Sequence, residues 1–366
     1  MKKLWMMVIA CLFSYSAQAG DKEVFKEVYQ LMLDNYIEDI DLSSFFNPVF
    51  SAIEKDDKDI HIIPEKKTVT VYYKGKIHKV YTRPTDEKNA EKWADYTDFL
   101  MTELKKISPE LQNKDFELAD VMLYNGVKKF NKDTKYYPAL DVGQVQEKIQ
   151  PYSASLQENG ILYVRMGTIN DYTAGEFAKT LQEYADPQGL ILDLRGNKGG
   201  YLKAALEIAD NFLEKGVMIF TIGRNPGQRK FYRASEGSYY KGKPIAILVD
   251  GDTASAAEAV VVALQKNNRA AIIGSQTYGK GTVQNIYALE NGSSIALTTE
   301  KFLGFEKIAI DGAGVRPDIC SSFYQTIEEL ETTRAKDVEH LECPKLVTSS
   351  ALDMKIAEKF IEISNK

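Results

Sequence analysis

Residues 244–258 read PIAILVDGDTASAAE and hold the two features that decide the fold. The run at residues 245–249 is short, wholly apolar and bounded by a proline and a glycine-containing turn, which is typical of a strand buried on both faces. A helix is predicted to begin at about Ala256, because alanine, valine and leucine dominate from there to Lys266. A buried strand that leads directly into a helix indicates an α/β layer.

The same alternation extends on both sides of this stretch. Further short, apolar, β-rich runs occupy residues 161–166, 189–194, 217–222 and 270–273. Helical stretches at residues 173–184, 201–214 and 256–266 separate several of these runs. Strands that alternate with helices predict a layer of buried, largely parallel strands within a core at residues 151–322.

The flanking regions have a different character, and residues 20–150 are predicted to be mainly helical. Apolar residues recur there at helical spacing in two sets: Phe25, Val28, Leu31, Met32 and Tyr36, then Trp93, Tyr96, Phe99, Leu100 and Leu104. Between them, residues 68–81 alternate about Lys74-Gly75 and predict a β-hairpin, whose lysines make it either an interaction arm or a solvated hairpin. Residues 323–366 are predicted to form a helical C-terminal extension.

The first 19 residues have the pattern of a secretory signal peptide. Two lysines precede an apolar stretch at residues 4–13, and Ala17-Gln18-Ala19 supplies the small residues of a cleavage site. The apolar stretch is too short for a membrane span. We therefore expect cleavage after Ala19 and an exported, periplasmic protein. Lipid anchoring through Cys11 is the alternative, but it would follow an unusually short apolar run.

The composition excludes some classes of function. The 366-residue chain has a net charge of −6, which becomes −8 when residues 1–19 are removed, so nucleic-acid binding is a poor hypothesis. The mature length indicates two or three domains. Cys320 and Cys343 either form a disulfide in an oxidising compartment or remain as two buried thiols. With three histidines and no suitable cysteine spacing, we expect no metal site.

Ser255 stands at the turn between the strand at residues 245–249 and the following helix. Helix N-terminal N–H groups concentrate positive potential that stabilises a developing oxyanion, so a serine here is a candidate nucleophile. The alternative is that Ser255, Asp252 or Thr253 caps the helix, which is the usual role of such residues there. The turn by itself leaves both interpretations open.

A nucleophilic serine needs a base, and the α/β segment contains no histidine, His340 being in the C-terminal extension. A Ser-His-Asp triad is therefore not expected. The remaining candidate is a desolvated lysine, and Lys280 stands in TYGKGTVQ between glycines that let the backbone pass close to its neighbours. An ordinary solvated lysine is the alternative. The order Gly274-x4-Gly279-Lys280 is also close to a phosphate-binding loop, but Gly281 replaces the residue that holds magnesium there.

The third notable segment is GLILDLRGNKGG at residues 189–200, where a buried strand runs into a loop with glycines. Paired glycines leave backbone N–H groups open to an anion or an oxyanion. The G-x-G-x-x-G order of dinucleotide-binding loops is absent. Asp193 and Arg195 are expected to form an ion pair, with each other or with a neighbour, that holds the loop.

Taken together, these segments resemble the core of the carboxy-terminal processing peptidases, also called tail-specific proteases. The resemblance extends from about Ile161 to Asp318 in uninterrupted order. It includes ILYVRM (161–166), GLILDLRGNKGG (189–200), PIAILVDGDTASAAE (244–258), GSQTYGKGTVQ (274–284) and GVRPD (314–318). Several motifs in the right order are far more specific than any one of them.

The resemblance implies a Ser/Lys dyad. Ser255 would be the nucleophile, Lys280 the general base, and Gln284 would hold the lysine in place. The backbone N–H groups of Ala256 and of Gly200, in preference to the glycine before it, would form the oxyanion hole. The implied reaction is acyl transfer, in which Ser255 attacks a peptide carbonyl and water clears the acyl-enzyme, without a metal or organic cofactor.

The implied fold is a crotonase-like, ClpP-like βαβ-rich core with a helical N-terminal region. This sequence departs from the family pattern at Lys198, where a proline is usual, and at Ala257, where a second serine is common. Only about twenty residues separate Pro138 from the strand at Ile161, so we expect no PDZ domain, which most relatives insert there. Substrate capture would then depend on the N-terminal region or on an adaptor partner.

The sequence therefore predicts an exported serine endopeptidase that acts on envelope or secreted proteins, alone, with an adaptor or as a homo-oligomer. The alternative is a non-catalytic peptide-binding or scaffold protein on the same fold. Intact Ser255, Lys280 and Gln284 argue against it, because a binding module has no reason to keep all three. A crotonase-like acyl-CoA enzyme would fit the fold but not the export signal.

Overall fold

The computed structural model describes residues 21–112, 116–139, 152–184, 186–304, 310–333, 338–347 and 350–366. The predicted signal peptide, with Cys11, lies outside the described residues, and so do residues 140–151, where relatives would insert a PDZ domain. Export, lipid anchoring and the missing PDZ domain therefore stay predictions. Within the described part of the chain, no helix is long and apolar enough to cross a membrane.

The chain forms two compact units. The first consists of Met1–Val145 together with Gln284–Thr299, and the second of Gln146–Val283 together with Glu300–Lys366. The first unit thus includes Gln284–Thr299, a segment that the sequence analysis assigned to the core. Sequence patterns identify the type of each element, but they do not show with which body a strand packs.

The first unit is mainly helical and contains one small sheet. Its helices are α1 (Asp21–Asn35), α2 (Leu42–Phe50), α3 (Ile53–Asp56), α4 (Ala90–Ile107), α5 (Pro109–Gln112) and α6 (Phe116–Lys128). Its strands are β1 (Ile60–Pro64), β2 (Thr68–Tyr73), β3 (Lys76–Thr82) and β4 (Lys135–Tyr137), together with most of β12 (Thr282–Ala288) and part of β13 (Ser294–Leu303). The first three form an antiparallel sheet in the order β1-β2-β3. The predicted hairpin is confirmed as β2 and β3, while β1 is an additional strand that the sequence analysis missed.

Local chemistry explains the hairpin and most of the helical core. Lys74 and Gly75 both have positive φ, 49° and 75°, as a tight hairpin turn between twisted strands requires. Of the residues chosen by helical spacing, those fully or almost fully buried are Phe25, Val28, Met32, Tyr36, Trp93, Tyr96, Leu100 and Leu104. Phe99 is 46% exposed, because it lies at the margin of the core beside the Tyr81 ring.

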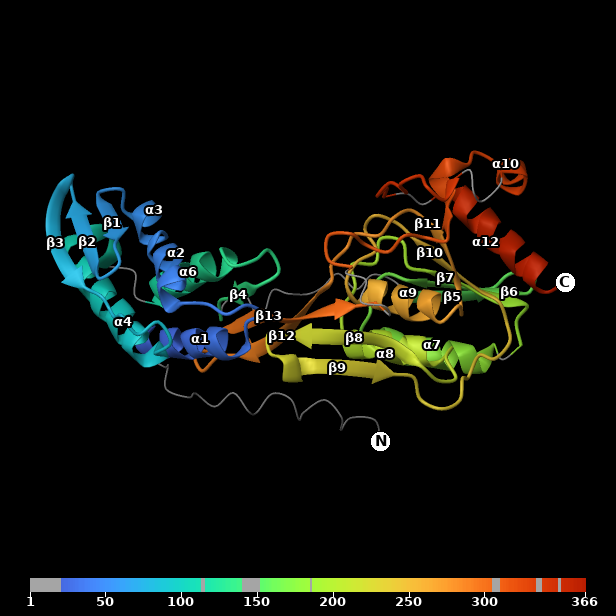
Figure 1. The fold of residues 1–366 in the computed structure, drawn as a ribbon, viewed down its shortest axis with the longest axis horizontal. Helices are drawn as coiled ribbons and strands as arrows, with labels where there is room; N and C mark the ends of the chain where they lie inside the picture. Colours follow the sequence, from blue (N-terminus) through green and yellow to red (C-terminus); the bar gives the residue numbers. More distant parts are fainter. Residues whose placement is uncertain are drawn as a thin grey trace, which may run out of the picture. The chain divides into compact units, whose positions relative to one another are not determined.

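The second unit is built around a six-stranded sheet in the order β14-β11-β10-β7-β6-β5 (Figure 1). The strands are β5 (Tyr152–Leu156), β6 (Ile161–Met166), β7 (Gly189–Asp193), β10 (Ile245–Val249), β11 (Ala271–Gly274) and β14 (Ile319–Cys320). Every neighbouring pair is parallel except β5 and β6. Helices α7 (Asp171–Glu183), α8 (Leu202–Asp210) and α9 (Ala256–Lys266) follow β6, β7 and β10 along the chain. The predicted α/β class is confirmed.

Helices cover both faces of this sheet. Helices α7, α8 and α9 lie on one face, and the C-terminal helix α12 (Ala351–Ser364) lies on the other (Figure 1). Successive side chains of a strand point to opposite faces of the sheet. Leu192 therefore packs in the core beneath α7, α8 and α9, and Ile191 packs in the core beneath α12. Because the sheet is parallel, the loops after β7, β10 and β11 begin at the same edge.

A second sheet contains β12 (Thr282–Ala288), β13 (Ser294–Leu303), β8 (Val217–Gly223) and β9 (Arg229–Arg233) in that order, with β4 also paired to β13. A 3-10 turn, η1 (Pro226–Gln228), joins β8 to β9. The run at residues 217–222 was expected in the parallel layer, but β8 pairs antiparallel with both β13 and β9, so that expectation is wrong. An apolar run predicts burial without specifying which sheet the strand joins.

The C-terminal extension is only partly helical. It contains η3 (Ser321–Phe323), α10 (Ile327–Thr332) and α12, whereas residues 339–347 form no helix. Of the two alternatives for the cysteines, the disulfide is the one found: Cys320 at the end of β14 is bonded to Cys343. Helix α12 packs against the parallel sheet through Ile356, Ala357 and Ile361.

Candidate active site

Ser255 is the residue that precedes α9, and its backbone has φ 57° and ψ −121°. A positive φ is uncommon for a residue with a side chain and costs on the order of 1–3 kcal/mol, so neighbouring groups must hold it. The Ser255 N–H donates to Glu258 Oε2 at 2.8 Å, and the N–H of Ala254 donates to Asn197 O at 2.9 Å. Strain at one half-buried serine is typical of a functional position.

The loop that carries Ser255 is fixed by Asp250 and Thr253. Asp250 Oδ1 accepts hydrogen bonds from the N–H groups of Gly196, Asp252 and Thr253 at 2.9 to 3.0 Å. The Thr253 hydroxyl donates to Leu194 O at 3.0 Å, so it holds two loops together and does not cap α9. These bonds place the loop after β10 against the loop after β7.

The glycine loop after β7 lies against Ser255. A methyl group on Gly199 would lie 2.8 Å from Ala256 N and 2.9 Å from Ser255 Cβ, so this contact requires glycine. The Gly199 N–H already donates to Asn197 Oδ1 at 2.8 Å. In the described part of the chain, the N–H groups of Gly200 and Ala256 donate no hydrogen bond, which leaves these two available to an oxyanion.

Lys280 lies half-buried in the loop between β11 and β12. The glycines on either side of it are closely packed: a methyl group on Gly279 would lie 2.7 Å from Gly314 N, and one on Gly281 would lie 2.5 Å from Asp311 N. The prediction that these glycines let the backbone pass close to its neighbours is confirmed. The N–H of Tyr278 donates to Thr253 O at 3.0 Å, which ties this loop to the Ser255 loop.

Glu258 connects the two candidate catalytic residues, and the sequence analysis missed this role. Its fully buried carboxylate accepts from Ser255 N and Lys280 N through Oε2, both at 2.8 Å. Through Oε1 it accepts from Gly279 N at 2.7 Å and from the Thr277 hydroxyl at 2.5 Å. One carboxylate therefore fixes the backbones of serine and lysine together. The available signal was the spacing of Ser255 and Glu258, three residues apart at the start of the helix, which is that of a capping box and accounts for only one of these bonds.

Gln284 lies on β12 in the first unit, whereas Ser255 and Lys280 lie in the second. Its Nε2 donates to Thr298 Oγ1 at 3.4 Å. The proposed orienting role of Gln284 therefore stays a prediction.

Asp193 and Arg195 form the expected ion pair beneath the glycine loop. The Arg195 guanidinium donates to both Asp193 oxygens, at 2.9 and 2.7 Å, and to Asp353 Oδ2 of α12 at 3.0 Å. Burial alone would raise the pKa of the Asp193 carboxyl, but Arg195 and then Arg165 outweigh burial and hold this pKa below its ordinary value. For Asp353, burial dominates and raises the pKa. The cluster is structural support for the loop.

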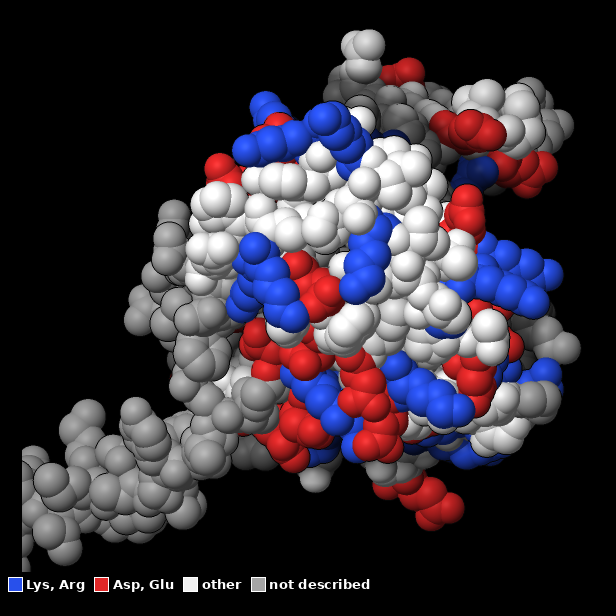
Figure 2. All heavy atoms as spheres, turned by 90° about the vertical axis from the view of Figure 1, so that its left-hand side faces the viewer, with Lys and Arg blue, Asp and Glu red and all other residues white. Residues whose placement is uncertain are grey.

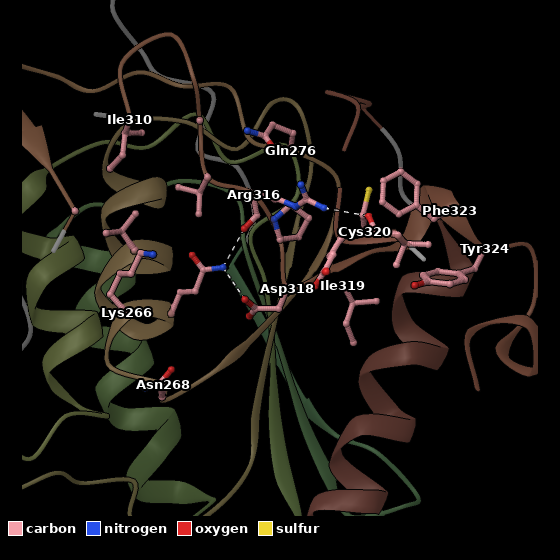
Figure 3. Close-up of a pocket in the computed structure, with 18 of the residues that line it drawn as sticks. Lys266, Asn268, Gln276, Ile310, Arg316, Asp318, Ile319, Cys320, Phe323 and Tyr324 are labelled. Atoms are coloured by element: carbon pink, nitrogen blue, oxygen red, sulfur yellow. Dashed lines mark hydrogen bonds between the residues drawn. The ribbon is translucent and has the colours of Figure 1, made fainter. Parts of the chain in front are cut away.

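A separate hollow of about 830 Å³ lies beside the C-terminal half of α9 (Figure 3). Gln265 and Lys266 of α9, together with Arg316 and Asp318, are among its lining residues, whereas Ser255 and Lys280 are not. Among the described residues, no cluster of His, Cys, Asp and Glu has the arrangement to hold a metal ion.

Comparison with known proteins agrees with this geometry. Residues 160–321 match the family model described as peptidase family S41. A carboxy-terminal-processing protease of Bartonella bacilliformis is 34% identical over 187 residues, which covers 49% of this chain and 43% of the relative. The carboxy-terminal processing protease CtpB of Bacillus subtilis is 34% identical over 166 residues, covering 45% of this chain and 34% of that protein. The chain thus spans less than half the length of these curated relatives.

Solved structures show a related fold at low sequence identity. A lipoprotein from Streptococcus agalactiae has a TM-score of 0.55 at 16% identity, covering 87% of this chain and 96% of its own. A photosystem II D1 C-terminal processing protease has a TM-score of 0.50 at 15% identity, covering 84% and 93%. The segment from residue 160 to residue 321, which contains Ser255, Glu258 and Lys280, therefore belongs to peptidase family S41, the family of the carboxy-terminal processing proteases.

Proposed function

We propose that this protein is a serine-type endopeptidase of the carboxy-terminal processing type with a Ser255/Lys280 dyad. The observation that carries the proposal is the shared carboxylate oxygen of Glu258, which accepts from the backbone N–H groups of both residues at 2.8 Å. The positive φ of Ser255 supports the proposal, because a strained serine at a helix N-terminus is costly to maintain without a function.

The proposed reaction is a two-step acyl transfer. Ser255 Oγ attacks the carbonyl carbon of the scissile peptide, and Lys280 Nζ takes the hydroxyl proton and returns it to the leaving amine. The N–H groups of Ala256 and Gly200 stabilise the oxyanion, and Gln284 orients Lys280. Water then attacks the acyl-enzyme and releases the carboxylic acid. No metal or organic cofactor is needed, and the core is of the crotonase-like type.

The substrates in this proposal are envelope or secreted proteins, because the N-terminal sequence has the pattern of an export signal. The N-terminal region or an adaptor protein would capture them in place of a PDZ domain, and the protein would act alone or as a homo-oligomer. An anchored form through Cys11 is the alternative for localisation.

The test is cleavage of unfolded casein and of an envelope protein extract by the purified chain. Ser255→Ala and Lys280→Ala are each expected to lower kcat/KM at least about a thousandfold. Two matched controls are expected to keep wild-type activity: Ser153→Ala, an exposed serine on β5, and Lys203→Ala, an exposed lysine on α8. Labelling by a fluorophosphonate reports on Ser255 directly. A wild-type protein that neither cleaves nor labels would contradict the proposal and favour a non-catalytic protein.

A further inference from the structure

A short non-helical segment, residues 343–347, runs beside both loops of the proposed dyad, and we call it the strap. Its carbonyl groups accept one hydrogen bond from each loop: Leu346 O accepts from Gly251 N at 2.7 Å, and Pro344 O accepts from Gln276 N at 3.1 Å. The first donor lies in the loop that ends at Ser255, and the second lies in the loop that leads to Lys280. The strap therefore bridges the two loops.

Lys345 makes a second connection to the loop that carries Lys280. Its Nζ donates to Tyr278 O and to Gly312 O, both at 2.9 Å. Tyr278 is two residues before Lys280, and Gly312 N in turn donates to Gly279 O at 2.9 Å. Hydrogen bonds from an ammonium group are stronger than neutral ones, so one exposed lysine restrains the backbone on which the proposed base stands.

The contact with the Ser255 loop is close. A methyl group on Gly251 would lie 3.0 Å from the carbonyl carbon of Lys345 and 3.2 Å from Leu346 N. A side chain at position 251 would therefore require the strap to shift by a few tenths of an ångström. The strap thus favours glycine at this position.

The strap is anchored on both sides. Its first residue, Cys343, is covalently bonded to Cys320 of β14. Beyond it, Ser350 O and Asp353 Oδ2 both accept from Arg195 Nη1 at 3.0 Å. Arg195 belongs to the loop that leads to the glycines beside Ser255. The C-terminal extension is therefore connected to all three loops at this edge of the parallel sheet.

We infer that the strap is a clamp for the dyad and that Lys345 is a positioning residue acting through the Lys280 loop; this inference depends on the proposed peptidase function. The disulfide holds one end of the clamp. Loss of the Lys345 ammonium removes its hydrogen bonds to the carbonyl groups of Tyr278 and Gly312 and loosens the base, and misplacement of a catalytic group by about 1 Å can cost a hundredfold in rate.

The test compares Lys345→Met with wild type in steady-state cleavage of casein. Lys345→Met is expected to lower kcat by about 10- to 100-fold with little change in KM, because the affected group acts on the reaction and does not bind substrate. Lys345→Arg, which keeps the charge and the donors, is expected to restore most of the rate. Lys203→Met, at an exposed lysine of α8, is the matched control and is expected to change nothing.

The pH profile separates positioning from a loss of folded protein. A loosened general base is better solvated, so the acid limb of fluorophosphonate labelling is expected to move to higher pH in Lys345→Met. An unchanged acid limb, with activity that falls only in proportion to the folded fraction, would overturn the inference and leave the strap a purely structural element.

Amide hydrogen exchange tests the clamp without any catalysis. The amides of Gly251 and Gln276 are expected to exchange at least about tenfold faster in Lys345→Met than in wild type or Lys203→Met.

Dithiothreitol is expected to slow turnover in wild type but not in a Cys320→Ser/Cys343→Ser variant, which is already slow. If the wild-type protein is active and Lys345→Met changes neither exchange nor turnover, the clamp is contradicted and the proposed function is not. If the wild-type protein never turns over, the proposed function is contradicted, and hydrogen exchange still tests the clamp.

Discussion

The six-stranded parallel sheet and the three-stranded antiparallel sheet differ in how many of their faces are covered. Strands β7 and β10 of the parallel sheet have no exposed residue, because helices cover both faces. Strand β3 of the three-stranded sheet has a single buried residue, Tyr81. The cross-strand rows Ile63–Thr70–Val80 and His61–Tyr72–Ile77 share the outer face of that sheet.

The outer face is not polar. Ile63, Ile77 and Val80 are 49, 62 and 52% exposed. Figure 2 views the molecule from this side, and uncharged side chains gather in its upper half, while acidic and basic side chains mix in the lower half. The covered sheet carries the proposed active-site loops at one edge, whereas one face of the three-stranded sheet is open to solvent. Burial on two faces gives the covered sheet a fixed base, and the hydrogen bonds of Asp250, Thr253 and Glu258 then hold the loops on it.

The largest effect is expected from breaking the charge cluster at the edge of the covered sheet. Arg195→Ala leaves the carboxylates of Asp193 and Asp353 without their shared cation, and removing one partner of a buried pair costs about 3–5 kcal/mol. Lys22→Ala, which breaks an exposed pair with Asp95 in the first unit, is expected to change the unfolding free energy little, because solvent screens that pair. Urea unfolding followed by circular dichroism measures both, and equal costs would contradict the comparison.

A nearly equal effect is expected from a cavity in the covered sheet. Ile191→Ala on β7 removes a fully buried side chain that packs under α12, and such truncations cost about 2–5 kcal/mol. Trp93 is the only tryptophan among the described residues and lies in the core of the first unit. Trp93 fluorescence therefore reports the unfolding of the first unit only. Circular dichroism reports the unfolding of the whole chain, so urea unfolding followed by circular dichroism measures the cost of Ile191→Ala. A cost below about 1 kcal/mol would mean that α12 does not cover this face.

Four of the six strands of the covered sheet were predicted from the sequence, and β5 and β14 were missed. Short, largely apolar runs such as GLILD and IAILV favour strands buried on both faces, and β7 and β10 were located almost to the residue. Strands β12 and β13 were missed for different reasons: β12 is mostly exposed or half-buried, whereas β13 is mostly buried but Thr298, Thr299 and Glu300 interrupt its apolar residues. Strand β8 was assigned to the wrong sheet for another reason: the partner of a strand depends on the whole fold and not on the strand's own sequence.

The sequence identified the candidate site residues, but it did not show the hydrogen bonds that hold them together. Motif order located Ser255 and Lys280, whose backbones the structure ties to one carboxylate. Glu258 was missed, because four hydrogen bonds converging on one side chain from two distant loops have no pattern along the chain. Residues 343–347 were missed for the same reason: their sequence is unremarkable, and only the contacts with both loops give them a role.

A smaller effect is expected from pH, through Asp193. Its folded-state pKa lies below the ordinary value of about 3.9, so the stabilisation it provides is fully present above about pH 4 and is lost as pH falls through the folded pKa. The difference in unfolding free energy between wild type and Asp193→Asn should therefore be constant from pH 7 to about 5 and shrink at lower pH. A difference that grows on acidification would reverse the sign assigned to this group.

The smallest effect is expected on the open face of the three-stranded sheet. Ile77→Ala removes the same atoms as Ile191→Ala, but this side chain is 62% exposed, so the cost should stay under about 1 kcal/mol, mostly from lower strand propensity. Urea unfolding followed by Trp93 fluorescence measures it, because β3 and Trp93 belong to the same unit. A cost near that of Ile191→Ala would mean that something covers Ile77 in solution. If that cost also increased with protein concentration, the cover would be a second copy of the chain, because only self-association makes apparent stability depend on concentration in a pure sample.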